Sequence, residues 1–363
     1  MKTVRHAAIG VFLACALNSQ GVDFAGWTVG EDWNGYGTIL RSTDSGVSWT
    51  RQGSGQVADT GMSGVVAVDP FTAWVVGAAN AGYATIYHTT DGGLTWERKG
   101  SAAQVPNTEL RKVTAFGDDS IWAVGPGTIL HSDDGGATWT NQIPAGYEST
   151  PLQGVYTPDG VNVWATGGPL DGYATILKSS DGGLSWMRQS GGDVGLMDHI
   201  LGVSAVDANT AWAMGGADGT NSWKVLGTTD GGAIWTAKNN GVHDGNEVCA
   251  VNALTVWAAA DSTIIGSTDG GANWDWWTSQ EYTMGISAVD SQQAWAVSAG
   301  LHGAIQRTTD GGTSWEKLTQ LGGENLPGLW TVSFSRDAIP EPASAALLVL
   351  GMAVISGRSR RRS

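Results

Sequence analysis

The sequence predicts an all-β fold, a seven-bladed β-propeller closed by its C-terminal strand. A turn phrase that ends in Trp occurs seven times, and a second Trp-containing phrase precedes each copy. The copies recur at intervals of 39–49 residues, which indicates a repeat architecture in which each unit packs on the next. Helical periodicity is absent between them, and turn residues arrive at the spacing of short strands.

The turn phrase reads Ser or Thr, any residue, Asp, Gly or Ser, Gly, two variable residues and Trp. Asp followed by glycine predicts a tight turn, because glycine adopts positive φ and the carboxylate accepts bonds from the next backbone N–H groups. The closing Trp offers an apolar face for packing. Since all seven copies share this context, we expect their aspartates to be structural caps, not catalysts or calcium ligands. They are Asp44, Asp91, Asp134, Asp181, Asp230, Asp269 and Asp310.

Three further segments complete each unit. An alternating run such as VVAVDP comes first, the second phrase follows (GWTVG at Trp27, AWAVS at Trp295), and a run such as TILRS precedes the turn phrase. Four short strands in a unit of ~43 residues are typical of a propeller blade. The first unit lacks an inner strand, and Leu329–Asp337 resembles one after the last unit. We therefore expect Leu329–Asp337 to pair into the first blade and close the ring.

The turn phrase resembles the Asp-box, the repeat of bacterial neuraminidases. Taken whole, residues 17–338 resemble the Asp-box propellers related to the photosystem II stability and assembly factor family, which implies seven blades. Asp-boxes also occur in sialidases, sortilin-like receptors and some glucan hydrolases, so the box specifies a turn and not an activity.

Residues 1–16 have the pattern of a secretory signal peptide. Lys2 and Arg5 precede the apolar stretch Ala7–Ala16, which is too short to span a bilayer. Cleavage near Ala16 would leave Cys249 as the one cysteine, and so no internal disulfide.

Residues 339–363 resemble the PEP-CTERM sorting signal of Gram-negative bacteria. Pro340, Glu341 and Pro342 are followed by the apolar run Ala343–Ile355 and then by an arginine cluster. The resemblance implies export, transient inner-membrane anchoring through this short transmembrane run, and processing by an exosortase-type enzyme. A plain tail anchor is the alternative. The expected location is the cell surface or the extracellular space.

The charge of the chain restricts its partners. Its formal net charge is −15. Without both terminal segments, 33 acidic and 13 basic residues remain, a net charge of about −20. This balance argues against nucleic acid and anionic membrane as partners. We expect a monomer with no cofactor and no bound metal.

Other charged positions repeat in register. The acidic turns Asp69, Asp119, Asp159, Asp207 and Asp290 are expected around one channel mouth, where a cation could sit, although Asx turns explain them. Basic residues share one third-strand slot, expected as a solvated arc: Arg41, His88, His131, Lys178 and Arg307. Two interpretations of the arc stay open: a docking surface for an acidic partner and a plain exposed strand face. A convergent arginine cluster of the sialidase type is missing.

Long loops between second and third strands break the repeat in four units. Each carries an aromatic residue, and we expect these residues to be exposed on the face opposite the turn phrases, where they could contact sugars or peptides. They are Trp33, Tyr36, Tyr83, Tyr173 and Trp223. The alternative is that each tyrosine begins the third strand and packs on its neighbour.

The sequence thus predicts an exported binding or assembly module at the cell surface or in extracellular polysaccharide, with a glycan or protein ligand. No convergent catalytic set is visible, which favours a non-enzyme. Two alternatives stay open: a photosystem-type assembly factor for membrane proteins, and an extracellular glycosidase or lyase with an unrecognised site.

Overall fold

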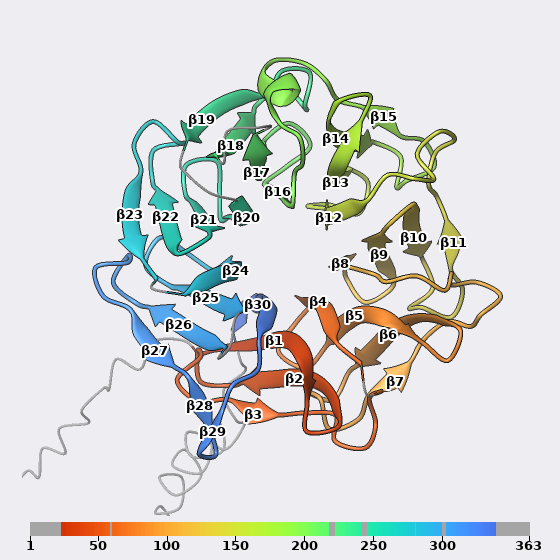
Figure 1. The fold of residues 1–363 in the computed structure, drawn as a ribbon, viewed down its shortest axis with the longest axis vertical. Helices are drawn as coiled ribbons and strands as arrows, with labels where there is room; N and C mark the ends of the chain where they lie inside the picture. Colours follow the sequence, from red (N-terminus) through yellow and green to blue (C-terminus); the bar gives the residue numbers. More distant parts are fainter. Residues whose placement is uncertain are drawn as a thin grey trace, which may run out of the picture.

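Seven four-stranded antiparallel sheets stand around a central channel in the computed structural model of the protein (Figure 1). The structure describes residues 23–58, 60–217, 222–240, 245–279, 281–299 and 303–338. The predicted seven-bladed propeller is therefore confirmed. The signal-peptide segment 1–16 and the sorting segment 339–363, with Pro340, Glu341 and Pro342, lie outside the described residues. The described part of the chain contains no apolar helix of membrane-spanning length.

The strands of the first four blades follow the predicted order. Blade 1 contains β1 (Phe24–Trp33), β2 (Tyr36–Ser42), β3 (Thr50–Arg51) and β30 (Leu329–Ala338). Blade 2 contains β4 (Met62–Ala67), β5 (Ala73–Asn80), β6 (Tyr83–Thr89) and β7 (Glu97–Arg98). Blade 3 contains β8 (Lys112–Phe116), β9 (Ser120–Gly125), β10 (Thr128–Ser132) and β11 (Thr140–Asn141). Blade 4 contains β12 (Leu152–Tyr156), β13 (Val163–Leu170), β14 (Tyr173–Ser179) and β15 (Met187–Arg188).

The remaining blades repeat the same order. Blade 5 contains β16 (Gly202–Ala205), β17 (Ala211–Ala217), β18 (Ser222–Thr228) and β19 (Thr236–Asn240). Blade 6 contains β20 (Gly245–Ala250), β21 (Val256–Ala260), β22 (Thr263–Ser267) and β23 (Asp275–Thr278). Blade 7 contains β24 (Tyr282–Ala288), β25 (Ala294–Ala299), β26 (Ala304–Thr308) and β27 (Glu316–Leu318). A 3-10 turn, η1 (Asp193–Leu196), and a small hairpin of β28 (Gln320–Leu321) and β29 (Glu324–Asn325) lie between blades.

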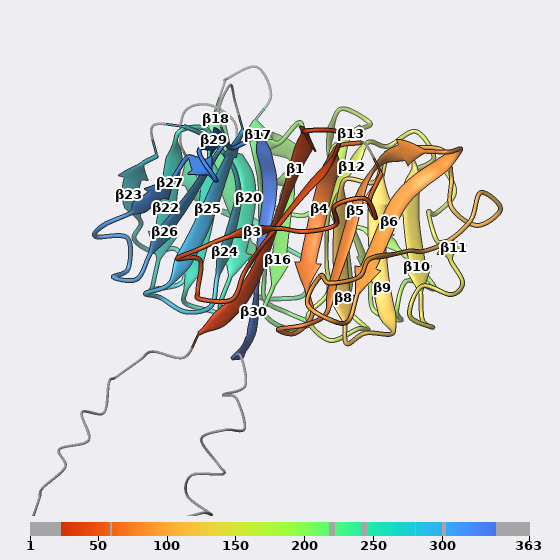
Figure 2. The ribbon, with the colours of Figure 1, turned by 90° about the horizontal axis from the view of Figure 1, so that it is seen from below.

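The two faces of the ring differ. The turn face carries the seven turn phrases. The start of β1 and the end of β30 also lie on this face: Phe24 pairs with Ala338, and the Phe24 carbonyl accepts a hydrogen bond from the backbone N–H of Ser45 in the first phrase. The hairpin face lies opposite, where the second and third strands of each blade join (Figure 2). Inner strands line the channel from one face to the other.

The chain closes its ring through β30, as predicted. This strand pairs antiparallel with β1, placing Ser333 opposite Trp27. The Phe334 ring stacks on Trp295 of blade 7 at a centroid distance of 3.7 Å and meets Trp49 of blade 1 edge-on. One strand from the C-terminal end thus binds the first blade to the last.

Tryptophans hold neighbouring blades together. The second-strand Trp of one blade meets the phrase Trp of the next edge-on, as in Trp74 with Trp139 and Trp212 with Trp274. All seven second-strand tryptophans are buried. Edge-on aromatic pairs add about 0.5–1.5 kcal/mol each beyond the area that they bury. The phrase Trp therefore acts as the wedge that the sequence predicts.

Three of the predicted long loops are regular hairpins. The second and third strands continue to two-residue turns at Asn34-Gly35, Ala81-Gly82 and Asp171-Gly172, all six residues with positive φ. Positive φ at both central residues is the type I′ geometry, whose twist matches that of the flanking strands. In place of the long loops that the sequence predicts, the connections here are two-residue turns, because β-bulges let the strands run on past the body of the blade.

Candidate functional site

The seven phrase aspartates are turn caps. In the third copy, Asp134 Oδ1 accepts bonds from the Ser132 hydroxyl at 2.9 Å and from the backbone N–H of Thr138 at 2.8 Å. Its Oδ2 accepts the Thr138 hydroxyl at 2.6 Å. The same Oδ1 pattern holds around the other six: Asp44, Asp91, Asp181, Asp230, Asp269 and Asp310. Their oxygens are engaged within their own turns, in seven separate blades.

Acid should destabilise the fold through these turns. Bonds from the Asn273 backbone and side chain lower the pKa of Asp269 to about 2. An unfolded Asp titrates near ~3.9, so the folded turn binds its proton less tightly than the unfolded chain. The stabilisation is therefore complete above pH ~4 and is lost as the pH falls towards 2. Thermal midpoints should drop steeply in that window, and Asp269→Asn should flatten the drop. A midpoint that stays constant from pH 4 to pH 2 would contradict this assignment.

The basic third-strand slot is not the solvated arc that the sequence predicts. His88 stacks on Trp74 at 3.9 Å and His131 on Trp122 at 4.4 Å, while Arg41 and Lys178 lie over the second-strand tryptophans of their own blades. Burial lowers the pKa values of Arg41, His88, His131 and Lys178. The Arg41 and Lys178 cations are stabilised on the faces of Trp27 and Trp164, whereas the two histidines, whose neutral form burial favours, stack on their tryptophans as aromatic rings.

Three of these side chains link adjacent blades. Arg41 donates to the Pro70 carbonyl of blade 2 at 2.8 Å, and His88 Nε2 lies 2.8 Å from Asp118 of blade 3. Lys178 donates to the Ala208 carbonyl of blade 5 at 2.7 Å. Arg307 stays within blade 7, 3.4 Å from Glu316. The slot therefore serves the scaffold, and a docking role for it has no support in these contacts.

The predicted aromatic contacts lie on the hairpin face, but an arginine covers each tyrosine. Arg98 lies 3.9 Å from the Tyr83 ring and donates to the carbonyl groups of Asn80 and Tyr83. Arg51 and Arg188 repeat this contact on Tyr36 and Tyr173. All three tyrosines begin third strands and are half-buried, as the alternative interpretation expects. Trp33 is also half-buried, with Arg51 at 4.8 Å.

Trp223 is not an exposed contact residue. Its side chain is only 1% exposed and packs with Met214 and Val225 in the core. The strand β18 begins at Ser222, so the indole points into the contact between blades 5 and 6, where Trp276 lies 5.5 Å away. The expectation of an exposed Trp223 is therefore wrong.

The acidic turns after the inner strands are Asx turns. Asp69 accepts bonds from the backbone N–H groups of Phe71 and Thr72 at 2.7 and 2.8 Å. Asp159, Asp207 and Asp290 repeat this pattern, whereas Asp119 is exposed. Among the described residues no group of three His, Cys, Asp or Glu side chains could hold a metal ion.

An ion pair between blades 3 and 6 plugs the middle of the channel. Lys112 on β8 and Glu247 on β20, 135 residues apart, bond through Nζ and Oε2. The Lys112 ammonium also donates to Thr331 Oγ1 on β30 at 3.0 Å. Burial raises the pKa of the Glu247 carboxyl, and the Lys112 charge opposes that rise. We call Lys112, Glu247 and Thr331 the channel plug.

Glycine occupies the plug level in the other four blades. The positions equivalent to Lys112 in strand register are Gly64, Gly154, Gly202 and Gly285. A Cβ on Gly202 would lie 2.8 Å from the Glu247 Cα, and one on Gly285 would lie 2.8 Å from the Thr331 Cα. Neighbouring inner strands approach closely at the level of these glycines. The side chains of Lys112, Glu247 and Thr331 are therefore enough to fill the channel at that level.

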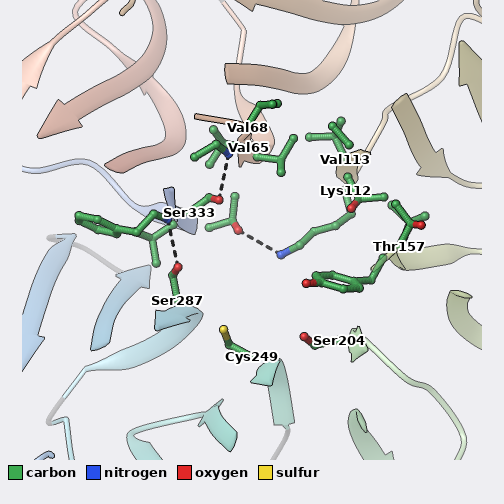
Figure 3. Close-up of a pocket in the computed structure, with 18 of the residues that line it drawn as sticks. Val65, Val68, Lys112, Val113, Thr157, Ser204, Cys249, Ser287 and Ser333 are labelled. Carbon is green, nitrogen blue, oxygen red and sulfur yellow. Dashed lines mark hydrogen bonds between the residues drawn. The ribbon is translucent and has the colours of Figure 1, made fainter. Parts of the chain in front are cut away.

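The plug separates two hollows. The turn-face hollow has a volume of about 310 Å³ and is lined by inner strands from all seven blades, with Ser204, Cys249, Ser287 and Ser333 around it (Figure 3). The hairpin-face hollow measures about 450 Å³. It combines the apolar side chains of Leu201, Met284 and Trp330 with the acidic ones of Glu31, Asp32 and Glu109. None of the five predicted aromatic contacts lines either hollow.

Sequence reasoning missed Lys112, Glu247 and Trp330, because single residues that break a repeat carry no motif. A signal does exist. Aligning the seven inner strands on their partner tryptophans places Lys112 and Glu247 in a column that otherwise holds glycines and one Thr.

The comparisons with known proteins agree with this fold. The family model described as photosynthesis system II assembly factor YCF48 matches residues 59–146. No curated protein matches the chain. The solved structure of YCF48 from Cyanidioschyzon merolae is 19% identical, with a TM-score of 0.53, and the match covers 72% of this chain and 86% of that one.

Two further solved structures are similar. YCF48 bound to D1 peptide is 18% identical, with a TM-score of 0.52 over 70% of this chain and 80% of that one. A streptogramin B lyase is 15% identical, with a TM-score of 0.57 over 75% of this chain and 86% of that one. An assembly factor and a lyase share this fold, so the likeness gives the architecture and the site must give the function.

Proposed function

We propose that the protein is an exported, non-catalytic binding or assembly module that holds its ligand on the hairpin face. The hairpin-face hollow carries the proposal. It offers an apolar wall of Trp330, Met284 and Leu201 beneath the exposed carboxylates of Glu31 and Asp32. Pockets of this size with a few convergent polar groups are the usual places for ligands.

The chemistry of the hollow favours a glycan or an extended protein segment. An indole provides a flat apolar face for a sugar ring or an apolar side chain, and the carboxylates accept bonds from hydroxyl or N–H donors. Among the described residues, Glu109 pairs with Arg111 at 3.4 Å, whereas no ion pair engages Glu31 or Asp32, so these two carboxylates set the charge of the rim. A neutral or cationic ligand is therefore favoured. The half-buried rings of Trp33, Tyr36, Tyr83 and Tyr173 are proposed as outer contacts.

The location is part of the proposal. The signal-peptide pattern at residues 1–16 and the sorting pattern at residues 339–363 support export, with transient anchoring and an exosortase-type partner. The net charge of −15 suits a protein that stays dispersed at the cell surface or in an extracellular matrix.

A second candidate function is the assembly of a membrane protein. The match of residues 59–146 to the YCF48 family model favours it, and a YCF48 has been solved with a D1 peptide bound. The two candidates differ in partner. Co-purification of the full chain with a nascent membrane complex supports the assembly role, whereas binding to extracellular polysaccharide supports the matrix role.

Replacing Trp330 should weaken ligand binding. We expect the purified chain to bind members of a glycan array or a peptide array, and Trp330→Ala to weaken that binding about 30-fold, the usual effect of a central anchor worth ~2 kcal/mol. The matched control is Trp276→Ala. Trp276 is 51% exposed on the outer strand β23, and its loss should leave the affinity unchanged.

A catalytic result would overturn the proposal. If the purified protein hydrolyses or eliminates a glycan, and one carboxylate replacement such as Glu31→Gln or Glu109→Gln abolishes that turnover, the protein is an enzyme. Equal losses of binding for Trp330→Ala and Trp276→Ala would instead place the ligand outside the hairpin-face hollow.

A further inference from the structure

We propose that the turn-face hollow is a second binding site, for a small neutral polyhydroxylated molecule of the monosaccharide or cyclitol class. The site lies on the opposite side of the channel plug from the hairpin-face hollow, and it does not depend on the function proposed for that face. Its volume of about 310 Å³ falls at the lower end of the range for small-molecule pockets.

A ring of hydroxyl groups lines the hollow at a single level. Seven inner-strand residues pair with the seven second-strand tryptophans, and all seven line the hollow. They are Ser333, Val66, Thr114, Tyr156, Ser204, Cys249 and Ser287. Five of them carry a hydroxyl, a group that both donates and accepts and so matches the hydroxyls of a polyol.

Backbone bonds fix the direction of three of these hydroxyls. Ser333 Oγ accepts the N–H of Ala67 at 3.0 Å, Ser287 Oγ that of Phe334 at 3.1 Å, and Ser204 Oγ that of Ala250 at 3.1 Å. Each donor belongs to the next inner strand of the ring. Within the described residues neither Ser287 nor Ser333 donates its own proton in return, so both O–H groups remain available to a ligand.

The backbone adds to the polar lining. Each inner strand is the last strand of its sheet, so its channel side has no strand partner. The N–H and C=O groups along that side need partners: the three serines each accept one N–H, and Arg336 and Cys249 donate to the carbonyls of Ala250 and Ala288. A polyol brings several donors and acceptors within one small volume and suits such a lining.

The charges of the hollow balance, which favours a neutral ligand. Lys112 and Glu247 form the plug at its inner end. Arg336 and Asp337 also line the hollow, one cation and one carboxylate, and Arg336 donates to the Ala250 carbonyl at 2.8 Å. The charged side chains of the lining thus sum to zero, and an anionic or cationic ligand would lose its hydration on entry without a net opposite charge to replace it.

Two aromatic rings offer faces for the C–H groups of a sugar. Tyr156 lines the hollow beside Ser204, and burial raises the pKa of its phenol, so the hydroxyl keeps its proton and can donate it. Phe116 is 52% exposed and lines the mouth. Stacking on such rings would orient the ligand without adding charge.

Cys249 allows a direct test with the full-length chain. Its thiol faces the hollow, and peptide mapping separates it from Cys15, the other cysteine of the chain (Figure 3). Binding of myo-inositol, glucose, galactose, mannose, xylose and sorbitol is measured by saturation-transfer NMR, with gluconate and glucosamine as charged comparisons. At saturation, a neutral probe should slow the alkylation of Cys249 at least about tenfold, because the ligand covers the sulfur.

Two variants test where the probe binds. Cys249→Leu fills the hollow and should weaken binding at least about tenfold, whereas Trp276→Ala, at an exposed residue of the outer strand β23, should leave the affinity unchanged. Tyr156→Phe should weaken binding by about the same factor as Cys249→Leu, through the loss of one hydroxyl. If no neutral probe binds, if the charged probes bind best, or if Cys249 stays equally reactive under saturating probe, the proposal is wrong. Should Cys249→Leu fail to fold, the alkylation result decides.

Discussion

Removing β30 should prevent the ring from forming. A chain that stops after Gly328 loses the strand that pairs with β1 and the Phe334 ring between Trp49 and Trp295. Blades 1 and 7 would then expose surface on which Leu329 and Val332 are now buried. Since blades cannot bury their faces alone, the product should be aggregated or lack the sharp thermal transition of the intact chain.

The control is a chain that stops after Ala338, which keeps all of β30 and should unfold cooperatively. A milder variant, Phe334→Ala, should lower the free energy of unfolding by about 3–5 kcal/mol, the usual cost of emptying a buried aromatic site. Urea unfolding measures both. A chain without β30 that melts like the intact protein would show that the ring closes in another way.

Breaking the channel plug should destabilise the protein in a pH-dependent way. Lys112→Met leaves the buried Glu247 carboxylate without its partner, and breaking one side of a buried pair costs about 3–5 kcal/mol. Burial already raises the pKa of Glu247, and losing Lys112 removes the charge that opposes the rise. The folded variant should therefore hold its proton to a higher pH than the unfolded chain does.

The sign of the pH effect follows. Below the unfolded pKa of Glu, near ~4.3, both states carry the proton and the variant should be close to the wild type. As the pH rises to 8, the unfolded chain releases the proton more readily than the folded one, and the deficit should grow. The double variant Lys112→Met with Glu247→Leu should recover most of the loss at pH 8. A deficit of equal size at pH 5 and pH 8 would contradict this account of the plug.

The scaffold could be predicted from the sequence because the same turn and packing residues occur in each of the seven repeats. The Asp–Gly turn, the Trp wedge and the unpaired first and last units each follow from local chemistry or from counting. The hairpins at Asn34-Gly35 and Asp171-Gly172 could also have been recognised, because these dipeptides are strong signals for type I′ turns.

The positions that depend on neighbouring blades were harder to predict. Whether Arg41 reaches Pro70 and His88 reaches Asp118 depends on how one blade packs on the next, and a strand pattern does not contain that information. The channel plug is a sharper case. Lys112 and Glu247 meet only because the ring brings blades 3 and 6 across the same axis. The acidic and basic residues that repeat stabilise the scaffold, whereas Lys112 and Glu247, which do not repeat, meet inside the channel.

The most direct test of this division compares one repeating and one non-repeating residue in a single pair of assays. Asp134→Ala and Trp330→Ala are each measured for thermal midpoint and for affinity towards the best array ligand of the intact chain. We expect Asp134→Ala to lower the midpoint and leave the affinity of the folded protein unchanged, and Trp330→Ala to weaken binding about 30-fold with a much smaller shift in midpoint. The reverse result, with binding lost in folded Asp134→Ala and retained in Trp330→Ala, would place the function in the repeated turns and contradict the account.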